Sequence, residues 1–151
     1  GKHLPYPDGS VTKIYSSHFL EHLEYPTAQK FLSEAFRVLK KDGIFRLVVP
    51  DLLWHTKKYV AATEKLISEP GIPDNRQPHD EFLNTVYGAF LETRRKGASH
   101  CYMYDLPTLN NMLKKAGFKK IHHVAFQKGQ DLELASHDNR EDESLHLEAI
   151  K

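Results

Sequence analysis

The first third of the chain alternates between two patterns of apolar residues, one typical of strands and one typical of a helix. Residues 5–9 form a turn-rich run of proline, aspartate and glycine, and the stretch Val11–Ser16 that follows it has the character of a strand. From Pro26 the apolar residues fall on one face of a helix, and they are Ala28, Phe31, Leu32, Ala35, Phe36 and Leu39. We therefore expect a strand followed by an amphipathic helix.

The next segment predicts the end of that helix and a second strand. Asp42 and Gly43 are expected to stop the helix, because glycine can adopt the left-handed conformation of a C-terminal cap. Ile44–Val49 is almost entirely apolar, as expected of a strand covered on both faces in a parallel sheet, and Pro50 ends it. Two parallel strands joined in this way are expected to have a right-handed crossover.

The middle of the chain is predominantly helical. After Asp51 a helical pattern includes Trp54, Tyr59, Val60, Leu66 and Ile67. Residues 70–73 break it, and the polar run 74–80 predicts a mobile loop. A second helix is expected from about Glu81. We interpret residues 52–99 as a helical insertion within a single domain.

The last third predicts one more helix and two strands. Pro107 is expected to begin a helix that Gly117 caps, before a strand over about Lys119–Phe126. A polar loop at 137–143 leads to Leu145–Ile150, where apolar and polar residues alternate as in a strand covered on one face. The order of elements indicates an α/β fold with helices flanking a sheet.

Composition limits the function classes more than it selects among them. A chain of 151 residues with 40% hydrophobic residues is enough for one domain. The 21 basic and 20 acidic residues nearly cancel, so no basic surface for nucleic acid is expected. There is no apolar run long enough to span a membrane and no signal-peptide pattern, and the single cysteine, Cys101, cannot form an internal disulfide. We expect a cytoplasmic protein that binds neither nucleic acid nor membranes.

Four short motifs occur in a characteristic order. They are a Leu-Pro-Tyr-Pro turn at Leu4–Ser10, the segment SSHFLEHL at Ser16–Leu23, an Arg-Val-Leu run at Arg37–Leu39 followed by Gly43, and Ala-Gly-Phe at Ala116–Phe118. Together they resemble the second half of a class I S-adenosylmethionine (SAM) dependent methyltransferase of the small-molecule type. The resemblance implies a truncated Rossmann-like methyltransferase sheet, made of strands four to seven of that fold with flanking helices.

The resemblance also implies site residues. Ser16, Ser17 and His18 would lie at the carboxyl end of strand four and face the methionyl part of SAM. Residues in the segments that the family uses for specificity would contact the substrate, and they are Trp54, His55, Tyr59, His100 and Tyr104. The alternative is structural: the first three residues would cap a turn, and the aromatic side chains would pack in the core. No catalytic residue is predicted.

The glycine-rich loop that such enzymes place against SAM would precede Leu4 and is not part of this sequence. Methyl transfer needs the methyl donor and the acceptor held in line. This chain would supply only one side of the cofactor site, so we do not expect it to catalyse the reaction alone. Two function classes stay open. One is a SAM-dependent methyltransferase, or its C-terminal part, acting on a small molecule. The other is a methyltransferase-derived binding or assembly module without affinity for SAM.

The predicted strand at 11–16 would lose its neighbour, strand one, if the first half were absent. An unpaired strand edge needs a cover, and the charge of Lys13 interrupts the apolar run as edge charges often do. We therefore predict either a homodimer or an upstream half of the protein across this strand.

A metal site is a further interpretation of the same residues. His18, Glu21 and His22 spell the H-x-x-E-H pattern of some zinc proteases, with Glu92 as a distant third ligand. The pattern is short, and the methyltransferase resemblance already accounts for these residues. We therefore predict no metal.

Overall fold

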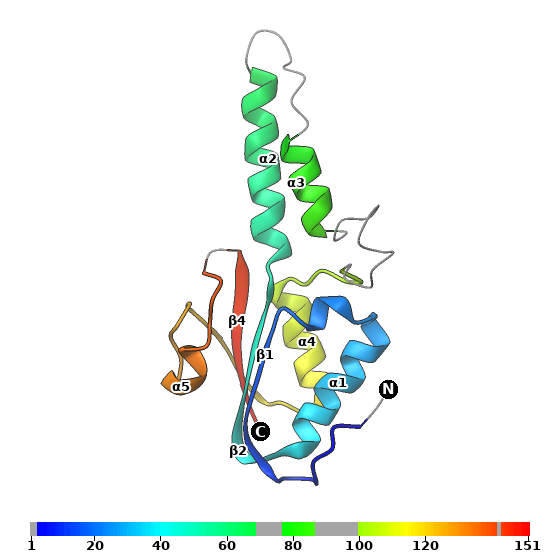
Figure 1. The fold of residues 1–151 in the computed structure, drawn as a ribbon, viewed down its shortest axis with the longest axis vertical. Coiled ribbons are helices and arrows are strands. Elements are labelled where there is room, and N and C mark those ends of the chain that lie inside the picture. Colours follow the sequence, from blue (N-terminus) through cyan, green and yellow to red (C-terminus); the bar gives the residue numbers. More distant parts are fainter. Residues whose placement is uncertain (1–2, 69–76, 87–99, 142) are drawn as a thin grey trace.

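The computed structural model describes residues 3–68, 77–86, 100–141 and 143–151. Their centre is a four-stranded mixed sheet of order β1-β2-β4-β3 (Figure 1). The strands are β1 (Val11–Ser17), β2 (Leu39–Pro50), β3 (Lys120–Val124) and β4 (Ser144–Ile150). β1 and β2 are parallel, whereas β4 runs antiparallel to both β2 and β3. The predicted α/β class is confirmed, and β1 lies at one edge of the sheet.

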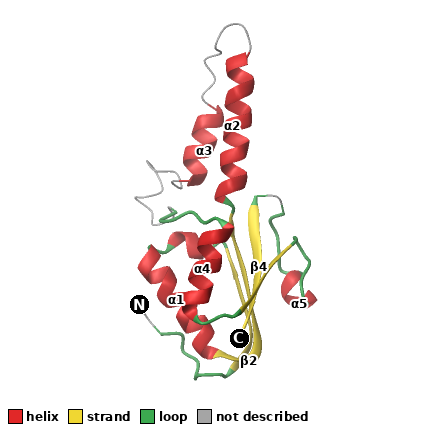
Figure 2. Ribbon diagram, turned by 180° about the vertical axis from the view of Figure 1, so that it is seen from behind, coloured by secondary structure: helices red, strands yellow, loops and turns green. Residues whose placement is uncertain are grey.

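Helices cover both faces of the sheet and extend beyond one end. Helices α1 (Tyr25–Val38) and α4 (Leu106–Ala116) lie together on one face, and the short helix α5 (Leu132–Ala135) lies on the other (Figures 1 and 2). Helices α2 (Leu52–Ser68) and α3 (Gln77–Val86) project side by side past the carboxyl end of β2 (Figure 1). A single 3-10 turn, η1 (Leu20–His22), follows β1.

The main core lies between the sheet and the α1–α4 face. Phe118 stacks on Phe45 at 6.0 Å between ring centroids and meets the edge of Phe36 at 5.1 Å. Leu32 and Leu113, from α1 and α4, are completely buried in the same cluster. These contacts explain why the apolar stripes of the two helices face the sheet.

The two predicted helix-ending glycines behave differently. Gly117 adopts a φ of 116° and caps α4, as predicted. The prediction for Gly43 is wrong: α1 ends at Val38, and Gly43 lies inside β2. A Cβ at Gly43 would lie 2.9 Å from the Lys40 carbonyl oxygen and 3.0 Å from that of Thr12, so this glycine permits the close approach of two strands.

Two other boundaries also need correction. α3 begins at Gln77, so residues 77–80 are helical and not part of the predicted loop; residues 74–76 and 87–99 lie outside the described chain. β4 is buried along both faces, and not on one face as predicted. The alternation misled because Glu148, a polar residue, is completely buried against Arg46 of β2.

Arg46 is the centre of a buried ion network beneath α5. Its Nε and Nη2 atoms donate to the two oxygens of Asp138, and its Nη1 atom donates to Glu148 Oε1 at 2.9 Å. The backbone N–H groups of Gln127 and Gln130 donate to the same two carboxylates at 3.0 and 2.7 Å. All three charged side chains are completely buried. The network therefore ties the segment around α5 to the second face of the sheet.

Candidate functional site

The carboxyl end of β1 turns sharply at His18. Its φ of 48° lies in the left-handed region, and its N–H donates to the carbonyl oxygen of Val48 at 3.0 Å. Its Nε2 atom hydrogen-bonds Ser144 Oγ at 3.0 Å. A left-handed backbone in a residue other than glycine is costly and often occurs at functional sites. The turn holds the His18 ring at the edge of the sheet.

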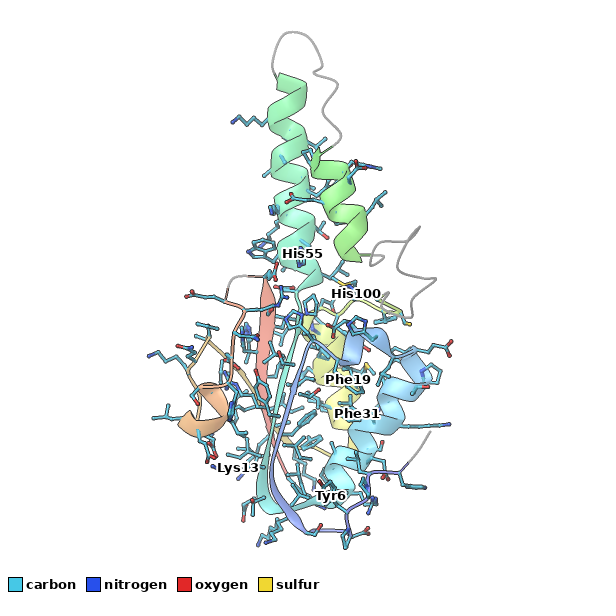
Figure 3. All side chains as sticks on the ribbon, viewed as in Figure 1. Tyr6, Lys13, Phe19, Phe31, His55 and His100 are labelled. Atoms are coloured by element: carbon cyan, nitrogen blue, oxygen red, sulfur yellow. The ribbon has the colours of Figure 1, made fainter. Side chains whose placement is uncertain are left out.

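A polar cavity of about 330 Å³, which we name the histidine pocket, opens beside this turn. Its walls come from the ends of β1 and β2, the start of α2, the segment before α4 and the segment before β4. The lining residues are His18, Glu21, His22, Pro50, His55, His100, Arg140 and Glu143. Figure 3 shows His55 and His100 near one another where the α2–α3 pair meets the sheet.

Glu21 places a buried carboxyl group in the histidine pocket. Its side chain is completely buried, and neither carboxylate oxygen accepts a hydrogen bond from the described residues. Its Oε1 atom lies 3.5 Å from His18 Nδ1 and 3.8 Å from His22 Nε2. Burial raises the pKa of Glu21. Glu21, His22 and His100 each offer a possible metal-ligating atom within 4.8 Å of the others.

The other charges of the histidine pocket are better matched. Arg140 donates to Glu143 at 2.7 Å. Burial, together with the charge of Arg140, lowers the pKa of His18 to about 4, and burial also lowers the pKa of His55. Both imidazoles are therefore neutral at pH 7, and the buried Nε2 atom of His55 has no hydrogen-bond partner among the described residues.

The predicted substrate residues separate into two groups. His55 and His100 line the histidine pocket, and Trp54 lines a shallow hollow that shares Arg140 and Glu143 with it. Tyr59 instead stacks on Phe82 of α3 at 4.7 Å between centroids. Tyr104 is completely buried, and its hydroxyl donates to the Leu20 carbonyl oxygen at 3.4 Å. These last two side chains hold helices and loops together.

The predicted cofactor residues lie in two different hollows. Ser16 and Ser17 line a second hollow, the β1 groove, of about 560 Å³ along the outer edge of β1. The Ser16 hydroxyl is buried and has no hydrogen-bond partner among the described residues. His18 faces the histidine pocket. The carboxyl end of β1 thus contributes to two adjacent hollows.

The β1 groove is largely apolar. Phe31 contributes to its wall, and Tyr6 and Phe19, 54% and 44% exposed, also line it. Figure 3 shows Phe19 and Phe31 on the α1 side. Among the described strands, β1 pairs only with β2. Lys13 forms ion pairs with Asp131 and Glu133 on the α5 side at 2.7 and 2.6 Å, so its charge does not fill the groove.

Comparison with known proteins identifies the fold to which this sheet belongs. A family model for a methyltransferase domain matches residues 1–47. Solved SAM-dependent methyltransferases of Thermotoga maritima and Mesorhizobium loti superimpose with TM-scores of 0.52 and 0.53, at 16% and 19% identity over 99% and 98% of this chain. The chain has the fold of the class I SAM-dependent methyltransferases. No curated protein matches it.

Within this methyltransferase fold, β1 and β2 correspond to strands four and five, and β3 and β4 to strands six and seven, as predicted. The chain spans 60% of the Thermotoga protein and 65% of the Mesorhizobium protein. The complex of the Haloferax volcanii Trm112 methyltransferase activator with a protein described as a putative methyltransferase gives a TM-score of 0.52 at 13% identity, over 97% of this chain and 57% of that one. No described helix is long and apolar enough to cross a membrane.

Sequence reasoning missed part of the histidine pocket. Arg140 and Glu143 carried no signal, because they are ordinary charges in a polar loop far along the chain. Glu21 and His22 were noticed only as members of a zinc-protease pattern. The third ligand considered for that pattern, Glu92, lies outside the described residues. The structure instead brings His100 to them.

Proposed function

We propose that this chain is the C-terminal part of a SAM-dependent methyltransferase that acts on a small molecule. The observation that carries the proposal is the meeting of two hollows at the carboxyl end of β1 in a methyltransferase fold. Open α/β sheets bind ligands outside the carboxyl ends of their parallel strands. The β1 groove and the histidine pocket would then hold the cofactor and the methyl acceptor.

The residues of β1 suit the cofactor side. Ser16 lines the β1 groove, and its buried hydroxyl has no partner among the described residues, so it is suited to bind a polar group of the cofactor. Ser17 lies beside it, and His18 follows at the strand end. SAM supplies an activated methyl group for direct displacement. The task left to Ser16, Ser17 and His18 is to bind and orient it.

The histidine pocket suits a polar acceptor. His55 is neutral, and its Nε2 atom has no hydrogen-bond partner among the described residues, so it can hydrogen-bond an acceptor hydroxyl or amine. His100 faces the same space, and Trp54 extends the wall outward. Tyr59 and Tyr104 would act only through the packing that holds these elements.

We further propose that another segment covers the β1 groove. An exposed strand edge beside apolar side chains such as Phe19 is a typical surface for pairing. An upstream half of the same protein fits the position of the groove, next to strand four. A homodimer or another partner chain is the alternative. Cytoplasmic location stays an expectation from sequence composition.

Calorimetric titration of SAM and S-adenosylhomocysteine into the chain tests this function, with the mass measured by light scattering on the same sample. We expect micromolar binding, weakened at least tenfold by Ser16→Ala. His122→Ala, a change on the exposed edge strand β3, serves as the control. Absence of heat at millimolar ligand would contradict cofactor binding by this chain and favour the assembly module.

A further inference from the structure

A carboxylate and two imidazoles from two distant segments converge in the histidine pocket. Glu21 and His22 are consecutive residues of η1, and His100 precedes α4. One ligating atom from each lies within 4.8 Å of the others. We propose that Glu21, His22 and His100 form a binding site for a divalent first-row transition-metal ion, with Zn²⁺ as its representative. The site lies in the pocket that we propose for the methyl acceptor, but its argument does not require that the chain binds SAM.

The unpartnered state of Glu21 is the observation that points to a ligand. A completely buried carboxylate normally accepts several hydrogen bonds or pairs with a cation, because leaving water is costly for a charge. Among the described residues Glu21 has neither: its oxygens accept no hydrogen bond, and the ring nitrogens of His18 and His22 lie 3.5 and 3.8 Å from Oε1. A cation between the carboxylate and the imidazoles would satisfy both oxygens.

The donor types select the class of ion. Two imidazole nitrogens and one carboxylate oxygen suit Zn²⁺ and its neighbours, whereas Mg²⁺ and Ca²⁺ prefer oxygen ligands. Zinc–ligand distances of about 2.0–2.2 Å bring donors to roughly 3.3 Å from one another in a tetrahedral site. Side-chain rotations of His22 and His100, which are both only half-buried, can close the present spread of 4.8 Å.

The backbone around the three groups is already fixed. The N–H groups of Cys101 and Tyr102 donate to the Glu21 carbonyl oxygen at 2.6 and 3.2 Å. The Cys101 thiol also donates to the His22 carbonyl oxygen at 3.3 Å. These bonds hold the segment that carries His100 against η1. The backbone therefore already holds the three side chains near one another, and metal binding requires only side-chain rotation.

Neighbouring residues support a cation. His18 places its Nδ1 atom 3.5 Å from Glu21, while its Nε2 atom is held by Ser144, which is the kind of support that metal-binding histidines receive. It is therefore suited to be a fourth ligand. Arg140, the arginine among the described residues that line the histidine pocket, is paired with Glu143. The carboxylate of Glu21 thus stays available to a positive ion.

Zinc titration by calorimetry, on chain freed of metal by a chelator, tests the site, and Co²⁺ absorption reports the ligands. We expect one high-affinity ion per chain. Glu21→Gln and His100→Ala should each weaken Zn²⁺ binding at least 100-fold. His122→Ala, an exposed histidine elsewhere, should leave the affinity unchanged. Circular dichroism identifies any variant that fails to fold, and Glu21→Gln, which keeps the side-chain size, then decides.

Three results would overturn the proposal. One is a wild-type chain that takes up no Zn²⁺ at about 100 µM free ion, roughly two orders of magnitude above a micromolar dissociation constant. The second is an equal loss of affinity in His100→Ala and His122→Ala, which would mean adventitious binding by scattered histidines. The third is full affinity in folded Glu21→Gln. Co²⁺ bands typical of tetrahedral nitrogen and oxygen ligands, lost with Glu21→Gln, would support it.

Discussion

Two regions of this molecule bury charge completely, and they differ in how the charge is satisfied. Beneath α5, the guanidinium of Arg46 is shared between Asp138 and Glu148, and every carboxylate oxygen accepts a hydrogen bond. In the histidine pocket, Glu21 is equally buried, but its oxygens accept no hydrogen bond from the part of the chain that the structure describes. The Arg46 network leaves no charge without a partner, which fits a structural role, whereas the Glu21 carboxylate is the group on which we base the proposed metal site.

The pKa values follow the same contrast. Burial acts to raise the pKa of Asp138, but hydrogen bonds from Arg46 and Gln127 and the charge of Arg46 outweigh it, so that this pKa is lowered. For Glu21, burial dominates and the pKa is raised. The fold therefore favours the charged form of Asp138 and disfavours that of Glu21.

The largest expected effect comes from breaking the satisfied network. Asp138→Ala leaves part of the Arg46 guanidinium buried without a partner, and we expect a loss of about 3–5 kcal/mol in the free energy of unfolding, measured by urea titration. Glu133→Ala removes a mostly exposed partner of Lys13 and should change stability little. Equal losses in both variants would contradict the structural role of the network.

Acid should remove the same stabilisation without a mutation. Because the pKa of Asp138 is lower in the folded chain than the ordinary value of 3.8, its contribution is present above that value and is lost as the pH falls below it. We expect the free energy of unfolding to decrease over this range, with a weaker dependence in Asp138→Asn. A pH slope unchanged by Asp138→Asn would contradict this assignment.

Gly129 makes room for Glu148 in the buried ion network, so a substitution there tests the network from a second position. It has a φ of 155°, and a Cβ there would overlap the Glu148 carboxylate, so the glycine permits the burial of that charge. We expect Gly129→Ala to cost about 1–3 kcal/mol of unfolding free energy. Gly9→Ala, whose added Cβ has only one neighbour, at 3.9 Å, controls for a positive φ alone, and a cost as large there would remove the argument.

The smallest expected effect lies at the strand end beside the histidine pocket. His18→Gly and His18→Ala both delete the ring, but only glycine relaxes the left-handed backbone at a φ of 48°. We expect the glycine variant to be more stable than the alanine variant by about 1 kcal/mol in thermal unfolding. Equal stabilities would mean that the turn stores no strain.

The sequence predicted the sheet and its helices because their apolar periodicity is strong. It mistook Gly43 for a cap, since glycine in a helix stop and glycine at a close strand approach look the same without the partner strand. It described β4 as half-covered, because the burial of Glu148 depends on Arg46, 102 residues away in the chain. Local patterns carry no information on such pairs.

The sequence predicted some residues of the candidate site and not others. His18, His55 and His100 were selected by resemblance, and the structure brings all three to one cavity. The isolation of Glu21 could not be predicted, because a missing hydrogen bond is a property of the packed chain. Tyr104 was selected by the same resemblance, and the structure buries its side chain completely.

The most direct test of the central claim compares the unfolding free energies of wild type and Glu21→Gln, without metal and with excess Zn²⁺. Without metal we expect the glutamine variant to be more stable by about 1–3 kcal/mol, since it buries no unpaired charge. With Zn²⁺ at 100 times its dissociation constant, the unfolding free energy of wild type should rise by about 2.7 kcal/mol. The difference between the two proteins should then become smaller or change sign. A less stable glutamine variant without metal, or no gain with Zn²⁺, would contradict the account.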